Sequence, residues 1–120
     1  MLPLCFFACG EADIPSKLID ANAFEKIMQI DPSAQIIDVR TPEEYQGGHI
    51  ERALNFDIKS SDFEQNISKL DKEKVVLIYC GVGARSAKAA SRFQKAGFDR
   101  VYDLTGGLAA WKEAGKEVIP

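Results

Sequence analysis

Residues 75–80 are Val75-Val76-Leu77-Ile78-Tyr79-Cys80, and residues 81–86 continue as Gly81-Val82-Gly83-Ala84-Arg85-Ser86. The first five side chains are all apolar, so we predict a strand that is covered on both faces, as in a parallel sheet between two layers of helices. A helix is expected at residues 86–96, ending before Gly97. Cys80 then stands at the carboxyl end of a central strand, where open α/β sheets bind ligands.

Short apolar segments and helical patterns alternate on both sides of this strand. The other expected strands lie at residues 36–39, 53–56 and 100–104, with a further short apolar run at residues 18–19. The other expected helices lie at residues 21–29, 42–47, 61–70 and 108–114. Asp20 and Thr41 are good N-caps for the first two helices, and Pro42 suits a first helical position. The alternation predicts a one-domain α/β fold.

Composition excludes several classes of function. The chain has 120 residues, 46% hydrophobic and 28% charged, which suits one globular domain of the commonest size, about 100–150 residues. The net charge is −3 and no block of Lys or Arg is present, which argues against nucleic-acid binding. The three cysteines, Cys5, Cys9 and Cys80, lack metal-ligand spacing, and His49 is the only histidine. We therefore expect no metal site.

The first 16 residues differ from the rest of the chain. Residues 1–9 are MLPLCFFAC, apolar throughout, and residues 10–16 are the polar stretch GEADIPS. This end is similar to the tail of a bacterial lipoprotein signal, although it lacks a positively charged start. The resemblance implies lipidation at Cys9 and a place in the cell envelope or periplasm, with residues 17–120 as the domain. An apolar tail folded back onto the domain, in a cytoplasmic protein, is the alternative.

The loop after Cys80 favours an ionised sulfur. Gly81 and Gly83 permit positive φ, so successive N–H groups can turn inward as an anion-binding nest. The start of the next helix adds its positive end, and Arg85 adds a permanent charge. Each feature favours a thiolate at Cys80 over a thiol, with a small buried core residue as the alternative. The candidate substrate-binding residues are Gly81, Val82, Gly83, Ala84, Arg85 and Ser86.

Motifs along the whole domain resemble those of the rhodanese family. In the first half they are Ile37-Asp38-Val39-Arg40, residues 44–50 (EYQGGHI), Ala53 and Asn55. In the second half they are residues 80–86, Gly97-Phe98, Val101-Tyr102 and residues 106–111 (GGLAAW). Together they cover roughly residues 17–118. The resemblance implies a central, mainly parallel five-stranded sheet flanked by helices on both faces, and sulfur transfer through a cysteine persulfide.

The spacing from Cys80 to Arg85 separates two chemistries of this fold. It is Cys-x4-Arg, whereas related dual-specificity phosphatases and arsenate reductases use Cys-x5-Arg. The shorter loop fits a single sulfur atom, whereas a loop with one more residue is wide enough to bind a tetrahedral oxyanion. The shorter loop therefore argues against phosphatase activity.

The resemblance implies a thiosulfate sulfurtransferase that needs no cofactor. Cys80 would take the outer sulfur of a thiosulfate-like donor and pass it to cyanide or a thiol. Arg85 would attract the anionic donor and stabilise the leaving charge. The partners are then small molecules, and we expect a monomer. A rhodanese-like sulfur carrier or protein-interaction module without turnover is the alternative.

The remaining polar positions are interpreted as structural. His49 is expected to bond to backbone, Trp111 to pack in the core, and Gly106-Gly107 to form a turn whose backbone approaches the active loop. A buried ion pair that holds the strand end in place is expected among three charged residues, with catalysis as the alternative. These are Asp38, Arg40 and Glu44.

Overall fold

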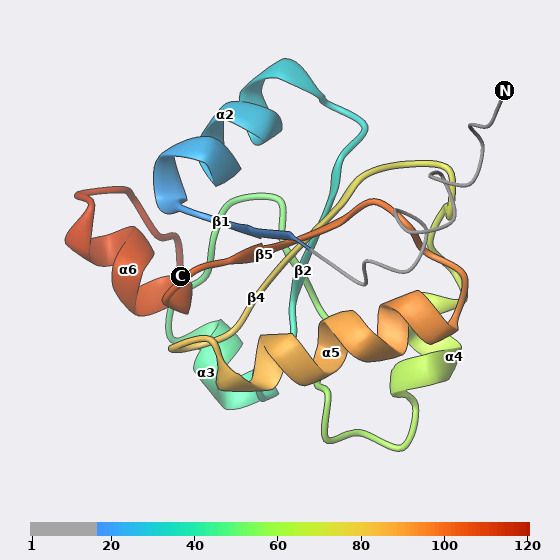
Figure 1. The fold of residues 1–120 in the computed structure, drawn as a ribbon. Coiled ribbons are helices and arrows are strands. Elements are labelled where there is room, and N and C mark those ends of the chain that lie inside the picture. Colours follow the sequence, from blue (N-terminus) through green and yellow to red (C-terminus); the bar gives the residue numbers. More distant parts are fainter. Residues whose placement is uncertain (1–16) are drawn as a thin grey trace, which may run out of the picture.

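The computed structural model describes residues 17–120, which form a five-stranded sheet between two layers of helices (Figure 1). The strand order is β1-β5-β4-β2-β3, and every neighbouring pair is parallel. The strands are β1 (Lys17–Ile19), β2 (Gln35–Asp38), β3 (Leu54–Asn55), β4 (Val76–Tyr79) and β5 (Val101–Leu104). The helices are α2 (Ala21–Ile30), α3 (Pro42–Gln46), α4 (Phe63–Ile67), α5 (Ala84–Lys95) and α6 (Gly107–Glu113). The predicted α/β fold is confirmed, with a sheet that is parallel throughout.

The central position of β4 follows from its sequence. All four of its side chains are fully buried, because apolar residues occupy both faces of the strand. Side chains alternate between the two faces of a strand, so Ile78 and Cys80 lie on one side and Tyr79 lies on the other. The predicted buried strand is therefore confirmed, and Cys80 follows directly after it.

Helices cover both faces of this sheet. On the face that carries Cys80, α4 and α5 contribute Phe63 and Phe93, whose rings meet edge to face. On the opposite face, α2 and α6 contribute Phe24 and Trp111, which meet in the same way. Figure 1 shows the strands running between α2 on one side and α5 on the other. Two apolar layers, one on each side of the sheet, therefore form the core.

Two helices differ from their predicted bounds by two residues or more at one or both ends, and the others by one residue. The expected helix at residues 61–70 is wrong in extent, since α4 covers only Phe63–Ile67. Asp62 makes no side-chain cap there, and the N–H of Leu70 donates to the carbonyl of Ile67 in a tighter turn. The helix expected from residue 86 begins two residues earlier, at Ala84, because Gly83 with φ +117° turns the chain directly into α5.

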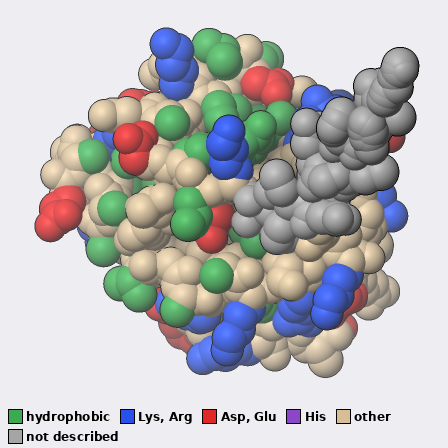
Figure 2. All heavy atoms as spheres, viewed as in Figure 1, with side chains coloured by type: hydrophobic (Ala, Val, Ile, Leu, Met, Phe, Trp, Pro, Cys, Tyr) green, Lys and Arg blue, Asp and Glu red, His purple; other side chains and the backbone are tan. Residues whose placement is uncertain are grey.

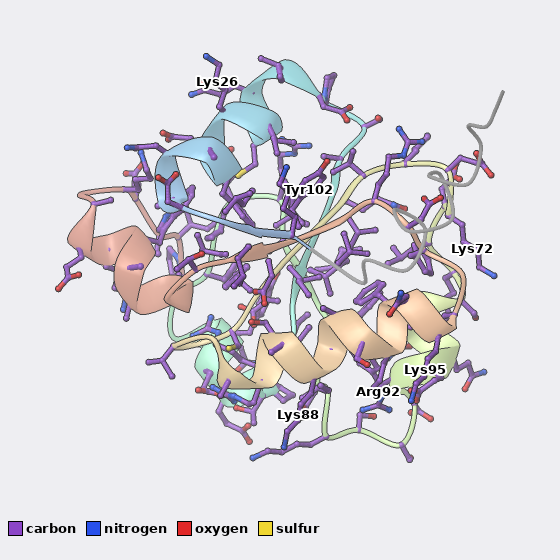
Figure 3. All side chains as sticks on the ribbon, in the orientation of Figure 1. Lys26, Lys72, Lys88, Arg92, Lys95 and Tyr102 are labelled. Carbon is purple, nitrogen blue, oxygen red and sulfur yellow. The ribbon has the colours of Figure 1, made fainter. Side chains whose placement is uncertain are left out.

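The outer side of α5 is basic. Figure 2 shows Lys and Arg side chains along the lower edge of the molecule, where α5 lies in Figure 1. Lys88, Arg92 and Lys95 extend from α5 away from the sheet (Figure 3). Their spacing of three or four residues places them on one side of the helix. Arg92 is paired with Glu64 of α4, so it ties the two helices of this layer together.

Several predictions concern residues 1–16, which lie outside the described residues. These are the linker, lipidation at Cys9 and the location in the cell envelope. Across residues 17–120, the structure has no helix with the length and apolar character needed to span a membrane. Over the same range, no group of three or more His, Cys, Asp or Glu side chains is arranged to hold a metal ion.

Candidate active site

The sulfur of Cys80 lies beneath the loop that joins β4 to α5. The Cys80 residue is fully buried, and its Sγ accepts a hydrogen bond from the backbone N–H of Gly83 at 3.0 Å. The hydroxyl oxygen of Ser86, also fully buried, lies 3.5 Å from Sγ. One backbone N–H group and one hydroxyl group therefore lie next to the sulfur.

The loop around this sulfur is shorter than the sequence predicted. Only residues 80–83 lie between β4 and α5, and Ala84, Arg85 and Ser86 form the first helical turn. The first N–H groups of a helix lack partners within the helix and carry its positive partial charge. Cys80 therefore faces the positive end of a 12-residue helix. Val82, in the middle of this loop, is 72% exposed.

The start of α6 is hydrogen-bonded to the backbone of the same loop. The N–H of Leu108 donates to the carbonyl of Cys80 at 2.8 Å, and the N–H of Ala109 donates to the carbonyl of Gly81 at 3.1 Å. Gly107 has φ +63°, and a β-carbon there would lie 2.5 Å from the carbonyl oxygen of Cys80. The predicted close approach of Gly106-Gly107 to the active loop is confirmed.

Arg85 pairs with the carboxylate of Glu44, which the sequence patterns placed in an ion pair with Asp38 and Arg40. Its two terminal nitrogens donate to the two carboxylate oxygens of Glu44, at 2.7 and 2.9 Å. Arg85 lowers the pKa of Glu44 to about 2, and Thr41 contributes to the same shift. Thr41 and Glu44 also form the capping box of α3, so that helix holds the carboxylate toward α5. The prediction that grouped Glu44 with Asp38 and Arg40 is wrong for Glu44.

The ion pair expected at the end of β2 is present between Asp38 and Arg40. Arg40 Nη2 donates to Asp38 Oδ2 at 2.7 Å, and both residues are buried. The same nitrogen donates to the carbonyl of Gly48 at 2.7 Å. The side-chain amide of Asn55 donates to the carbonyls of Asp38 and Arg40. This pair links β2 to the segments that follow it and makes no contact with the Cys80 sulfur among the described hydrogen bonds.

His49 and Trp111 also occupy structural positions. The His49 ring stacks on Tyr45, with centroids 3.8 Å apart, and its Nδ1 lies 2.9 Å from the carbonyl oxygen of Tyr45. A carbonyl can only accept, so Nδ1 carries the hydrogen. Trp111 is 3% exposed, and its Nε1–H donates to the carbonyl of Glu117. Both expectations, a backbone bond for His49 and core packing for Trp111, are confirmed.

Asp103 is a buried carboxyl group to which the sequence patterns did not point. It lies on β5 opposite Ile78 of β4 and is 1% exposed. Among residues 17–120, its Oδ1 finds no hydrogen-bond partner. Burial raises the pKa of Asp103, and a hydrogen bond from Ser86 opposes that shift. One sequence pattern could have indicated Asp103, namely an acidic residue inside an otherwise apolar strand.

The chain matches the family described as Rhodanese-like domain over residues 20–114, most of its length. It belongs to the rhodanese-like family. Thiosulfate sulfurtransferase GlpE from Shewanella oneidensis is 35% identical to this rhodanese-like chain over 82 residues, covering 68% of this chain and 79% of that protein. The uncharacterized protein YqhL from Bacillus subtilis is 41% identical over 78 residues, 65% of this chain and 60% of that protein.

Solved structures support the same assignment for the fold. The solution structure of the rhodanese-like domain from the Anabaena sp. protein Alr3790 has 31% sequence identity and a TM-score of 0.74. The match covers 85% of this chain and 77% of that one. This is therefore a rhodanese-like domain in fold, and its named relatives support sulfurtransferase activity in general.

Asp103 gives this rhodanese-like domain a predicted dependence of stability on pH. Because burial raises its folded-state pKa, the folded protein loses stability as pH rises from the unfolded value of about 4 through the folded value. Asp103→Asn removes that ionisation. We expect the stability of the variant relative to the parent to increase as pH rises from 4 to 7, measured by urea unfolding at each pH.

Asp99→Asn is the matched control, because Asp99 is exposed and lies four residues earlier. Its unfolding free energy should follow that of the parent at both pH values. If the difference in unfolding free energy between Asp103→Asn and the parent is the same at pH 4 and pH 7, burial does not raise the pKa of Asp103.

Proposed function

We propose that this rhodanese-like domain carries a sulfane sulfur as a persulfide on Cys80 and transfers it from a thiosulfate-like donor to cyanide or a thiol. The observation that carries the proposal is the environment of the Cys80 sulfur. It accepts the N–H of Gly83 at 3.0 Å and faces the first turn of α5. Hydrogen bonds to an ionised group are stronger than those to a neutral one, so this environment stabilises an anionic sulfur.

The proposed cycle has two displacement steps at sulfur. The Cys80 thiolate attacks the outer sulfur of thiosulfate, a new S–S bond forms, and sulfite leaves with the electron pair of the broken bond. The acceptor thiolate or cyanide then attacks the outer sulfur of the persulfide. That S–S bond breaks, its electron pair returns to Cys80 as thiolate, and the acceptor leaves with the sulfur. No electrons enter or leave the cycle, so no redox cofactor is required.

The burial of Cys80 favours a small donor. Because the residue is fully buried, a bulky donor has little exposed surface of Cys80 to meet. Once the persulfide forms, the added sulfur extends the reactive atom by about 2 Å, the length of an S–S bond. A bulkier acceptor can therefore meet the outer sulfur more easily than a bulky donor meets Sγ.

Intact mass after thiosulfate treatment tests the proposal. The chain should gain one sulfur atom, and addition of cyanide should remove it with release of thiocyanate. If reduced Cys80 gains no sulfur from thiosulfate or from other persulfide donors, the persulfide proposal is wrong. A protein-interaction module without turnover is then the better interpretation.

The Arg85 guanidinium should assist anionic donors through its charge. We expect Arg85→Ala to lower kcat/KM for thiosulfate about tenfold and to change the use of an uncharged persulfide donor much less. Glu44→Gln tests the cause, because it leaves the Arg85 charge in place without its carboxylate partner. KM for thiosulfate should fall in Glu44→Gln if charge is what matters. Equal losses in both variants, for both donors, would instead mean that the pair only positions the loop.

A further inference from the structure

We propose that the outer side of α5 and the neighbouring Val82 form a docking surface for an acidic protein whose cysteine thiol accepts the sulfur. The acceptor role rests on the proposed persulfide chemistry. The charge and the position of the surface are independent of that chemistry and can be tested separately.

The charged residues of α5 are all cations. Steps of three or four residues place them on one side of the helix, over about 15 Å of its length. They are Arg85, Lys88, Arg92 and Lys95. By contrast, α2 and α6, on the other face of the sheet, each carry one Glu and one Lys. The chain as a whole has 18 acidic and 15 basic residues, so the positive charge is concentrated on α5.

Helix stability accounts for only part of this charge. Arg92 and Lys95 lie in the last turn, where the negative end of the helix dipole favours cations. Arg85 lies in the first turn, where the dipole disfavours a cation, and Lys88 follows one turn later. Lys88 and Lys95 are exposed and, within residues 17–120, take part in no ion pair. Their charges are therefore available to a partner.

The basic side of α5 begins at the loop that holds the Cys80 sulfur. Arg85 Nη2 lies 3.2 Å from the position that a β-carbon of Gly81 would take, so the guanidinium group lies against this loop. Lys88, Arg92 and Lys95 then follow one another along α5 away from the loop (Figure 3). A protein bound along this side of the helix is therefore next to the site of the chemistry.

Val82 adds an apolar contact at the same place. It belongs to the loop of residues 80–83 and is 72% exposed. The other large apolar side chains that are exposed within residues 17–120 lie on β1, α2 and β3, outside this loop, and they are Leu18, Ile30 and Leu54. Protein interfaces combine an apolar centre with a polar rim, and Val82 with the cations of α5 offers both.

The ion pairs on this side of the molecule favour a protein over a continuous polyanion. Arg85 is paired with Glu44 and Arg92 with Glu64, and the two glutamate side chains are 38% and 57% exposed. An anionic membrane presents negative charge over its whole surface and would repel these carboxylates. A folded protein can place single carboxylates at Lys88 and Lys95 and leave the two ion pairs intact.

A small charged contact suits an acceptor that binds, takes the sulfur and leaves. Complementary charge raises the rate of association more than the final affinity, and small interfaces are typical of transient complexes. The acceptor thiolate attacks the outer sulfur of the Cys80 persulfide, and a new S–S bond forms. The S–S bond to Cys80 breaks, its electron pair returns to Cys80 as thiolate, and the partner leaves as a persulfide.

Amide chemical-shift mapping tests the surface without sulfur chemistry. The full chain is titrated with a short peptide that has glutamates around one serine, and with the same peptide carrying glutamines instead. The acidic peptide should shift the signals of residues 82–95, and the glutamine peptide should not. Lys88→Glu combined with Lys95→Glu should abolish these shifts. Lys26→Glu combined with Lys112→Glu is the matched control and should keep them, because both lysines are exposed on α2 and α6.

Three results of this titration would overturn the proposal. They are no shifts on α5, equal shifts with the glutamine peptide, and equal shifts after the reversal of Lys88 and Lys95. Vesicles of phosphatidylglycerol test the other occupant. If the parent binds them, the chain with both lysines reversed does not, and the acidic peptide shifts nothing on α5, the surface serves a membrane and a protein partner is wrong.

Sulfur release from the Cys80 persulfide measures the effect on the acceptor. The chain carries Cys5→Ser and Cys9→Ser, and the acceptors are the same two peptides with cysteine in place of serine. Reversal of Lys88 and Lys95 should slow release to the acidic peptide about tenfold at low ionic strength and change release to the glutamine peptide little. The difference should largely vanish at about 1 M salt, where the screening length is about 3 Å.

The two measurements separate this inference from the proposed function. If the acidic peptide maps to α5 while the parent gains no sulfur from any donor, the docking surface stands and the sulfurtransferase proposal fails. If the persulfide forms but every variant releases its sulfur equally to both peptides and no shifts appear on α5, the sulfurtransferase proposal stands and the docking surface is wrong.

Discussion

Cys80→Ser is expected to reduce sulfur transfer to the background rate, a loss of at least about 1,000-fold. A serine hydroxyl remains protonated at neutral pH and cannot take a sulfane sulfur as a stable persulfide. The change keeps the size of a fully buried side chain nearly constant, so the core should be little affected. The rate of thiocyanate formation from thiosulfate and cyanide measures the loss, and intact mass should show no sulfur gain at this position.

The two N-terminal cysteines provide the control for this experiment. A chain with Cys5→Ser and Cys9→Ser keeps Cys80 as its only cysteine and should transfer sulfur like the parent. Transfer that survives in Cys80→Ser but disappears in the chain lacking Cys5 and Cys9 would place the chemistry on the N-terminal residues. Such a result would contradict the proposed role of Cys80.

Gly107→Ala should damage both stability and activity. The added β-carbon would lie 2.5 Å from the Cys80 carbonyl oxygen and 2.6 Å from that of Gly81, both of which are backbone atoms. The loop must therefore move, and the hydrogen bonds from the start of α6 to Cys80 and Gly81 must lengthen. We expect a loss of about 3 kcal/mol in unfolding free energy and at least a tenfold loss in kcat/KM, because displacing a reacting group by about 1 Å is costly.

Gly115→Ala is the matched control for this prediction. Gly115 also has a positive φ, +78°, but a β-carbon there meets nothing within 4 Å. It therefore incurs only the backbone strain of about 1–2 kcal/mol and should keep normal kcat/KM. If Gly107→Ala and Gly115→Ala have equal effects on both stability and kcat/KM, the contact between α6 and the active loop does not hold the site in place.

Local patterns account for most of the fold and for the central residue of the site. Five successive apolar residues at 75–79 predict a strand covered on both faces, and β4 (Val76–Tyr79) is that strand. Thr41 followed by Pro42 predicts the start of α3, and its capping box is present. These signals work because backbone conformation and capping depend on residues close together in the chain. The helix start at Ala84 was missed, since a glycine with positive φ can replace a side-chain cap.

The sequence by itself determined the alternation of strands and helices, the position of Cys80 after the central strand, and the glycines that let the chain turn there. Tertiary structure decided which charged and polar groups meet at that strand end. Arg85 and Glu44 are 41 positions apart, and Asp103 is buried on the face that carries Cys80 only because β5 lies next to β4 beneath α5. Such pairings depend on strand order and register, which long-range packing of the whole core selects and no local pattern records.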